Sequence, residues 1–524
     1  MADIKNPLAD FAFDKLPTEL LVEIFHHARN RGRVYHDPKP KHLYPIALTQ
    51  VCRYWRNVAL AAPTLWTDIR VMQHDTGGAL EGPRIYLERS GTCPIFLTWF
   101  SYVEPSGSDF QDVIDDLIIP GAERWQRITV IAGEDYTSEI FLDAIEHLNF
   151  PILQDIEVSS MLLELTPSSR ALCHSAPLLR RCRLRGVPSL PPPSNLVVLD
   201  YMFSALAFTD FNLDPLLEFL PHVAHSLEHL RFAPPPVSKV QFTPRTSKIT
   251  LEHLKSLLIR DSHTIMDHIL TPSLAHFVIL CPLGQEKMDP SVFEGFSAPM
   301  LRSIQFYGVP LLPTLEVHNF PSMFPHLNSF TLSGCTDESA FALLLEPPEP
   351  KKPSSLQKAS KYPPKHRKVQ NPFPSLKELT VSDTTSWTTF QAAIEKRLKN
   401  GDKTLRKIQL PEAETAAVIL SHLRRWLPAH GIELALYEPG ELPVAALEFQ
   451  DDFCNDETDL FLAIVELNEW TRYQEDGMDP DQEWDYDGYE DEDEDENFDW
   501  ELDPELYSDE DENENENEYE GKLE

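Results

Sequence analysis

Basic residues are scarce in this chain of 524 residues, where 45 Lys and Arg stand against 84 Asp and Glu, a formal net charge of −39. The acidic excess is concentrated at one end. Residues 475–524 hold 27 acidic side chains and one Lys, a net −26, which leaves −13 for the first 474 residues. The sequence therefore argues against nucleic acid as a partner, because contacts to phosphate need basic surface.

Other absences narrow the class of protein. Seven Cys without a CxxC motif or regular spacing do not indicate a disulfide framework. The N-terminus lacks the basic and apolar regions of a signal peptide. No run approaches the roughly 18 apolar residues of a membrane helix. We expect an intracellular protein, cytoplasmic or nuclear, with reduced thiols and no membrane contact.

Motifs for catalysis and cofactor binding are also missing. The chain has no P-loop, no GxGxxG, no GxSxG and no HExxH sequence. His222, His225 and His229 have a spacing that would align them on one helical face for a metal, but Leu227 between them belongs to a strand motif described below. We therefore expect no enzymatic activity, no cofactor and no metal.

Two amphipathic segments lie between residues 13 and 71. The first, LPTELLVEIFHHARN, opens with Pro17, which suits the first turn of a helix. Its apolar positions share one helical face: Leu20, Leu21, Ile24 and Phe25. The second, IALTQVCRYWRNVALA, has the same spacing and ends before Pro63. The two segments predict a small helical domain.

The combined pattern resembles the F-box family. The matching residues are Leu16, Pro17, Glu19, Leu20, Leu21, Ile24, Phe25, Val51, Cys52, Arg53, Trp55, Arg56, Pro63, Leu65 and Trp66. The ending Pro-x-Leu-Trp is similar to the large fungal F-box families. The resemblance implies binding to a Skp-type adaptor and, through it, to a cullin ubiquitin ligase. It assigns adaptor contacts to Leu16, Pro17, Leu20, Leu21, Ile24 and Val51. We assign Trp55, Leu65 and Trp66 to internal packing.

A short unit recurs between about residues 86 and 437: an optional Pro, then Leu-x-x-apolar-x-apolar. Its first apolar residue stands at Trp125, Leu153, Leu179, Leu196, Leu227, Leu254, Leu274, Leu301, Leu327, Leu376 and Leu405. Most spacings lie near the period of a leucine-rich repeat. In PLLRRCRLRG the apolar residues can be buried while Arg181, Arg183 and Arg185 alternate outward. The period favours stacked parallel strands in a leucine-rich-repeat-like solenoid over independent strands in several α/β domains.

Helices connect strands toward the end of this region. Residues 386–401 carry Phe390, Ile394 and Leu398 on one face and end at Gly401. TAAVILSHLRRWLPAHG precedes IELALY in the same order. The expected fold class is therefore α/β: a helical F-box at 13–71, a solenoid at 86–437 with parallel strands and helices, and a disordered acidic tail.

A solenoid suits a protein partner better than a small molecule, since it presents its strands as one surface. The strongest candidates for holding a protein substrate are Arg183, Arg185, Arg231, Arg260, Gln305 and Tyr307. Together with Arg181, the arginines suggest a partly basic patch for an acidic or phosphorylated partner, or for the chain's own tail. The alternative is that each side chain is simply solvated.

Four further segments have their own predictions. Residues 1–12 are a flexible N-terminus. Residues 347–372 are a disordered Pro-rich insertion with seven Lys and Arg, interpreted as a solvated loop or a basic targeting patch. Residues 438–474 include an amphipathic helix that caps the solenoid, and residues 475–524 are too acidic to fold. The tail supports a second function, a non-catalytic scaffold or chaperone-like protein that binds basic proteins.

Overall fold

The computed structural model describes the chain in segments. They are residues 16–31, 45–73, 80–101, 111–132, 135–160, 172–203, 211–234, 240–243, 247–260, 264–280, 293, 296, 298–307, 323–333, 373–381, 387–401, 403–411 and 417–437. All of them belong to the first of two units, Met1–Asn455, and the second unit is Asp456–Glu524. The predictions for residues 1–12, 347–372, 438–474 and 475–524 lie outside the described residues.

The N-terminal region is helical, as predicted. Its elements are α1 (Thr18–Arg31), α2 (Ile46–Val51), α3 (Arg53–Ala61) and the 3-10 turn η2 (Pro63–Trp66). Helix α3 begins where the Cys52 sulfur accepts a hydrogen bond from the Trp55 amide at 3.4 Å. Pro63 stands at the start of η2, where its missing N–H leaves no bond unmade.

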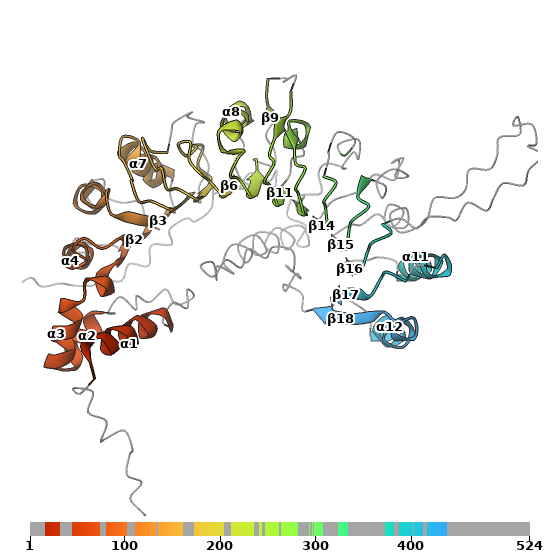
Figure 1. The fold of residues 1–524 in the computed structure, drawn as a ribbon, viewed down its shortest axis with the longest axis horizontal. Coiled ribbons are helices and arrows are strands. Elements are labelled where there is room, and N and C mark those ends of the chain that lie inside the picture. The colour runs from red at the N-terminus through yellow and green to blue at the C-terminus, as the bar shows by residue number, and fades with distance from the viewer. Residues whose placement is uncertain are drawn as a thin grey trace, which may run out of the picture. The chain divides into compact units, whose positions relative to one another are not determined.

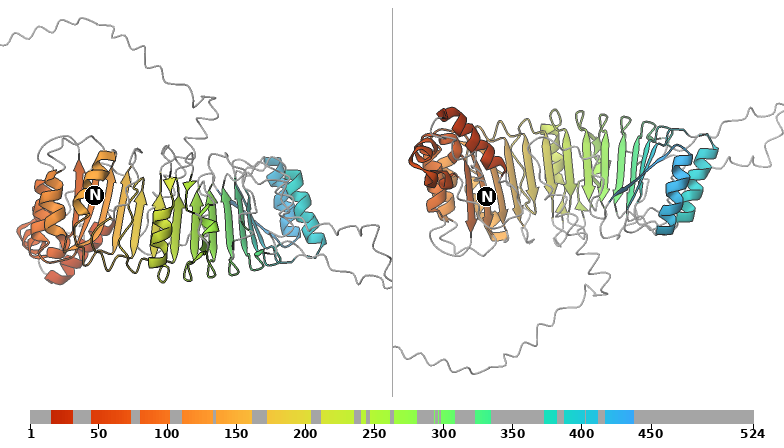
Figure 2. Two further views of the ribbon diagram at one scale, coloured as in Figure 1. Left: turned by 90° about the horizontal axis from the view of Figure 1, so that it is seen from above. Right: turned by 90° about the horizontal axis from the view of Figure 1, so that it is seen from below.

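A single sheet of fourteen strands follows, and every neighbouring pair in it is parallel (Figure 2). Its strands are β1 (Asp68–Gln73), β2 (Ile95–Ser101), β3 (Trp125–Ala132), β4 (Asp155–Ser160), β5 (Arg181–Arg185), β6 (Val198–Met202), β8 (His229–Ala233), β11 (Ser256–Arg260), β13 (His276–Leu280), β14 (Ser303–Tyr307), β15 (Ser329–Ser333), β16 (Glu378–Val381), β17 (Lys407–Pro411) and β18 (Glu433–Tyr437). Strand order follows chain order, so each connection returns the chain to the same edge of the sheet.

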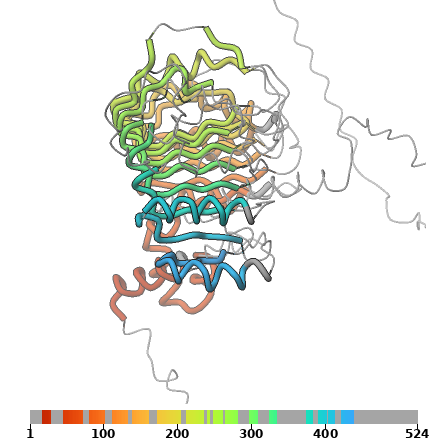
Figure 3. The backbone as a smooth tube through the Cα atoms, turned by 90° about the vertical axis from the view of Figure 1, so that its right-hand side faces the viewer, coloured from red at the N-terminus to blue at the C-terminus, as the bar shows by residue number. Residues whose placement is uncertain are grey.

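Helices lie along one side of this sheet (Figure 1). They are α4 (Glu81–Arg89), the π-helical turn η3 (Ile114–Ile118) with α6 (Ile119–Gly121), α7 (Asp135–Ile145), α8 (Asp214–Val223), α11 (Trp387–Lys399) and α12 (Ala417–Ala429). Small additions are β7 (Phe211–Asn212) with β9 (Val240–Gln241), β10 (Ile249–Thr250) with β12 (Ile269–Leu270), and the 3-10 turn η4 (Thr264–Asp267). The expected α/β class is confirmed, and the view along the sheet shows each strand stacked on the next (Figure 3).

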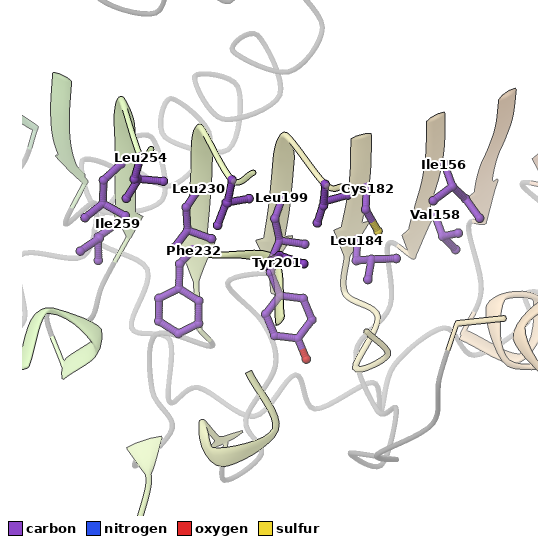
Figure 4. Packing of buried hydrophobic residues seen from close by; sticks show 14 of the residues in the cluster. Ile156, Val158, Cys182, Leu184, Leu199, Tyr201, Leu230, Phe232, Leu254 and Ile259 are labelled. Atoms are coloured by element: carbon purple, nitrogen blue, oxygen red, sulfur yellow. The ribbon is translucent and has the colours of Figure 1, made fainter. Parts of the chain in front are cut away.

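The recurring apolar unit marks these strands accurately. From Leu153 to Leu405, each lead leucine stands two positions before the first residue of a strand, and each is buried. Trp125 is equivalent, because Arg127, two positions later, pairs in register with Asp155 at the start of β4. The two apolar positions that follow each lead residue point into the core, as Figure 4 shows for Ile156 and Val158.

The sheet begins earlier than predicted. Strand β1 starts at Asp68, inside the range that we assigned to the helical domain, and β2 precedes the first recognised unit. Neither strand carries the Pro-Leu-x-x start that marks the later ones. The predicted helices near the C-terminal end are confirmed as α11 and α12, with Gly401 at φ +84° after α11.

Candidate interaction surfaces

The first two turns of α1 divide their apolar residues between the core and solvent. Leu21 and Phe25 are buried, and the Phe25 ring meets Trp55 of α3 edge to face with centroids 5.0 Å apart. Leu20 and Ile24, four residues apart on one helical face, are 53% and 44% exposed. Because burial of a Leu or Ile side chain is worth about 1.5–3 kcal/mol, each leaves a large stabilisation unused in this chain.

Helix α2 repeats this division. Leu48 packs into the core, whereas Val51 at the last position of the helix is 59% exposed. Leu60 of α3 is exposed as well. Among the described residues, eight large hydrophobic side chains are exposed, and four of them lie in residues 16–66. The helical region therefore carries an unusual density of uncovered apolar groups.

Firm internal packing holds these helices in place. The indole N–H of Trp66 donates to the Ala59 carbonyl at 2.8 Å, its ring meets Tyr86 of α4, and the Arg89 guanidinium lies 4.4 Å from its centroid. The Tyr54 hydroxyl donates to the Leu16 carbonyl at 2.8 Å. Leu65 and Trp66 are fully buried, which confirms their assignment to packing. The exposed residues thus stand on a rigid base that continues into β1 and α4.

The six predicted adaptor contacts differ in their accessibility. Leu20, Ile24, Val51 and Pro17 are exposed, and Leu16 is half-buried. Leu21 has no exposed surface, so the structure corrects its assignment from adaptor contact to core packing. The term "apolar surface" below denotes Leu20, Ile24 and Val51.

A second surface is the polar face of the sheet, the side opposite the helices. Residues on this face alternate with core residues along each strand: in β5, Cys182 and Leu184 are buried with the core, while Arg181, Arg183 and Arg185 take the other side. By the same alternation, all six predicted substrate-binding residues lie on this face: Arg183, Arg185, Arg231, Arg260, Gln305 and Tyr307.

Opposite charges alternate across the polar face between β3 and β8. In one row, Asp155 Oδ2 lies 3.5 Å from Arg127 Nε and 3.7 Å from Arg181 Nε. In the next, Arg183 Nη1 lies 3.5 Å from Glu157 Oε2 and its Nε lies 3.6 Å from Asp200 Oδ2. Arg231 Nη1 continues this row at 3.4 Å from Asp200 Oδ2.

This charge ladder corrects the predicted basic patch. Asp200 is 1% exposed and lies between two arginines on the adjacent strands. Arg181, Arg183 and Arg231 are therefore each ion-paired within the sheet, although Arg181 shares Asp155 with Arg127. Arg185 is half-buried and Arg260 is buried. The substrate roles of these residues stay predictions. Between β3 and β8, however, the polar face carries ion-paired arginines rather than a basic patch.

Beyond β8, the row of the polar face that contains Asp200 and Arg231 becomes uncharged and continues through Leu258, Val278 and Gln305. Leu258, Val278, Leu280 and Tyr307 form a cluster separate from the main core. The Tyr307 hydroxyl donates to Gln305 Oε1 at 2.8 Å, and both residues are buried. Burial raises the pKa of Tyr307, so its hydroxyl keeps the proton that this bond requires. The same row continues with neutral Thr331 and Thr380.

Nothing in the described segments has the arrangement of a metal or thiol site. No group of three His, Cys, Asp or Glu residues among them is placed to hold a metal. His222 lies in the last turn of α8, whereas His229 begins β8, so His222, His225 and His229 do not share one helical face. Burial raises the pKa of Cys173 to about 12 and also raises that of Cys182, which keeps both thiols protonated at neutral pH. In the part of the chain that the structure describes, no helix is long and apolar enough to cross a membrane.

Comparison with known families identifies the helical region. A family described as F-box-like matches residues 13–72, the segment that carries α1, α2, α3, η2 and the apolar surface. The match confirms the resemblance for this segment and supports an F-box protein. It does not extend over the sheet. No curated protein matches the chain.

Proposed function

We propose that this protein is the substrate-recognition subunit of an SCF-type cullin ubiquitin ligase. F-box domains in general bind Skp-type adaptors in cullin complexes. In this chain the apolar surface formed by Leu20, Ile24 and Val51 would bury itself against such an adaptor. The single observation that carries the proposal is the exposure of these apolar side chains inside the F-box-like segment.

The sheet supplies the second half of the proposed function. We infer that its parallel strands form a leucine-rich-repeat-like solenoid, because lead leucines at a near-regular period precede one strand after another. The protein would hold a protein substrate on these strands and perform no chemistry itself. Support comes from the rigid connection of the helical region to the sheet through Trp66, Tyr86 and β1.

Co-purification of the full chain with a Skp-type adaptor tests the proposal. Leu20→Asp with Ile24→Asp places two charges where the adaptor would bury apolar groups. We expect at least about a hundredfold loss of affinity, since burying an unpaired charge costs several kcal/mol. Both residues are exposed in the free chain, so its unfolding midpoint should change little.

A matched control is available on the sheet. Leu178 and Met300 are 50% and 49% exposed, so Leu178→Asp with Met300→Asp makes the same chemical change on equally exposed residues. This control should keep adaptor binding. Equal loss in both variants, or no adaptor binding by the unmodified chain, would contradict the proposal.

A further inference from the structure

A row of basic side chains crosses the ends of the strands in the second half of the sheet. Arg302, Lys377 and Arg406 each stand one position before a strand, β14, β16 and β17 respectively. All three are exposed. We call these three residues the basic row.

Backbone hydrogen bonds fix the members of this row at one level of the sheet, with Asn328 of the β15 segment between Arg302 and Lys377. The Asn328 amide donates to the Arg302 carbonyl at 2.7 Å, and the Lys377 amide donates to the Asn328 carbonyl at 2.7 Å. The Arg406 amide then donates to the Lys377 carbonyl at 2.8 Å. With neighbouring strands about 4.8 Å apart, Lys377 and Arg406 are separated by about 5 Å along the row and Arg302 and Lys377 by about 10 Å.

Within the described segments, ion pairs do not balance the charges of the basic row. In the described segments, no carboxylate pairs with Arg302, Lys377 or Arg406, whereas Lys255, at the equivalent position before β11, pairs with Glu228. Among the described residues, Glu433 lies on the next strand after Arg406, and Glu378 follows Lys377 at the start of β16. Lys407 lies in register between Glu378 and Glu433, so these two carboxylates have a nearer cation in their own row.

We propose that the basic row binds an acidic peptide segment of a partner protein. Side chains on one side of an extended peptide repeat about every 7 Å, so a segment with alternating acids that runs across the strand ends can meet all three cations. Arginine and lysine bind carboxylates by charge-assisted hydrogen bonds. The first 474 residues carry a net charge of −13, which repels the denser charge of nucleic acid more strongly than that of a short peptide.

This inference deepens the proposed function, because it names the chemistry of the substrate segment that the sheet would hold. Only the interpretation of the peptide as a substrate segment rests on the proposed function. Peptide binding at the basic row does not require the apolar surface of α1 and α2, so the two parts of the account can fail separately.

Fluorescence anisotropy on the full chain tests the inference. The probe is a labelled peptide of about eight residues with alternating Glu and Ser, long enough to span the row, and a Gln–Ser peptide is its uncharged match. We expect Arg302→Gln with Lys377→Gln and Arg406→Gln to weaken binding of the acidic peptide about tenfold, as three exposed ion pairs would. Added salt should likewise weaken binding of the acidic peptide by the unmodified chain.

The matched control removes three positive charges from the helical side. Lys399→Gln, Arg424→Gln and Arg425→Gln change α11 and α12, whose corresponding side chains are also exposed. These changes should leave peptide affinity within about twofold, since all three residues lie on helices and none belongs to the basic row. Both triple variants should keep full adaptor binding, which separates failure here from failure of the proposed function.

Charge reversal gives a second test that does not depend on loss of binding. Arg302→Glu with Lys377→Glu and Arg406→Glu should bind a Lys–Ser peptide more tightly than the unmodified full chain does, because three carboxylates replace three cations in the row. Three results would overturn the inference: equal affinity of the acidic peptide for the unmodified chain and the Gln variant, no binding by the unmodified chain, or tighter binding of an oligothymidylate that is lost in the same variant.

Discussion

The two halves of the sheet use arginine differently. In β5 and β8, Arg183 and Arg231 share the almost fully buried carboxylate of Asp200, and Arg183 also reaches Glu157. At the start of β14 and β17, Arg302 and Arg406 are exposed, and no described carboxylate pairs with them. Arginine therefore joins neighbouring strands by ion pairs in the first half of the sheet, and in the second half it is accessible to a partner. Partners on the neighbouring strands, rather than the count of arginines, decide which role each residue has.

Removal of the Asp200 carboxylate should destabilise the half of the sheet in which arginines are ion-paired. Asp200→Ala leaves Arg183 and Arg231 on a nearly buried face without their shared counter-ion. We expect a loss of about 3–5 kcal/mol in the free energy of unfolding, the range seen when one partner of a buried pair is removed. Denaturant unfolding of the full chain measures this loss.

Arg406→Ala is the matched change in the other half. Its cost should stay within about 0.5 kcal/mol, because surface substitutions away from packed or paired groups have small effects. A comparable loss in the two variants would contradict the distinction between the halves.

Alkaline pH should lower the free energy of unfolding by a smaller amount than Asp200→Ala does. Cys173 and Cys182 are buried beside the paired half, and Asp200 and Asp155 contribute, after burial and Cys173, to the raised pKa of Cys182. For Cys173 the folded pKa is about 12 against an ordinary value of 9.0. Its contribution to stability is therefore complete below pH 9 and is lost as pH rises from 9 toward 12, because only the unfolded thiol ionises readily there.

At about pH 10, ionisation of Cys173 in the unfolded chain lowers the free energy of unfolding by about 1 kcal/mol. Cys173→Ala should remove that part of the alkaline loss, as seen by comparing denaturation midpoints of the two proteins at pH 8 and pH 10. An identical pH dependence for both proteins would show that this thiol is not shielded as the structure describes.

The repeat pattern predicted most of the sheet, because burial of a leucine two positions before each strand is a local, periodic requirement. Strand β1 escaped detection although Trp66 stands two positions before it, because Trp66 was assigned to the helical domain, and β2 has no lead leucine. The charge ladder could not be predicted at all. Its pairs join residues such as Arg183 and Asp200 that meet only through strand register, which spacing along the chain does not reveal.

The helical region shows the same limit on a smaller scale. The sequence placed Leu20, Leu21, Ile24 and Phe25 on one apolar stripe, and the structure buries Leu21 and Phe25 while exposing Leu20 and Ile24. An apolar stripe wider than the available core must leave one side uncovered. Which side is covered depends on tertiary neighbours such as Trp55, so the adaptor assignment of Leu21 was wrong whereas Leu20 and Ile24 remain accessible.

Hydrogen exchange of the full chain, measured with and without a purified Skp-type adaptor, tests the central claim most directly. The account predicts slower exchange at the amides of α1 and α2 when the adaptor is bound, and unchanged exchange at β14 to β17. Unchanged exchange in both helices at a saturating adaptor concentration would contradict the claim that the apolar surface is the adaptor-binding site.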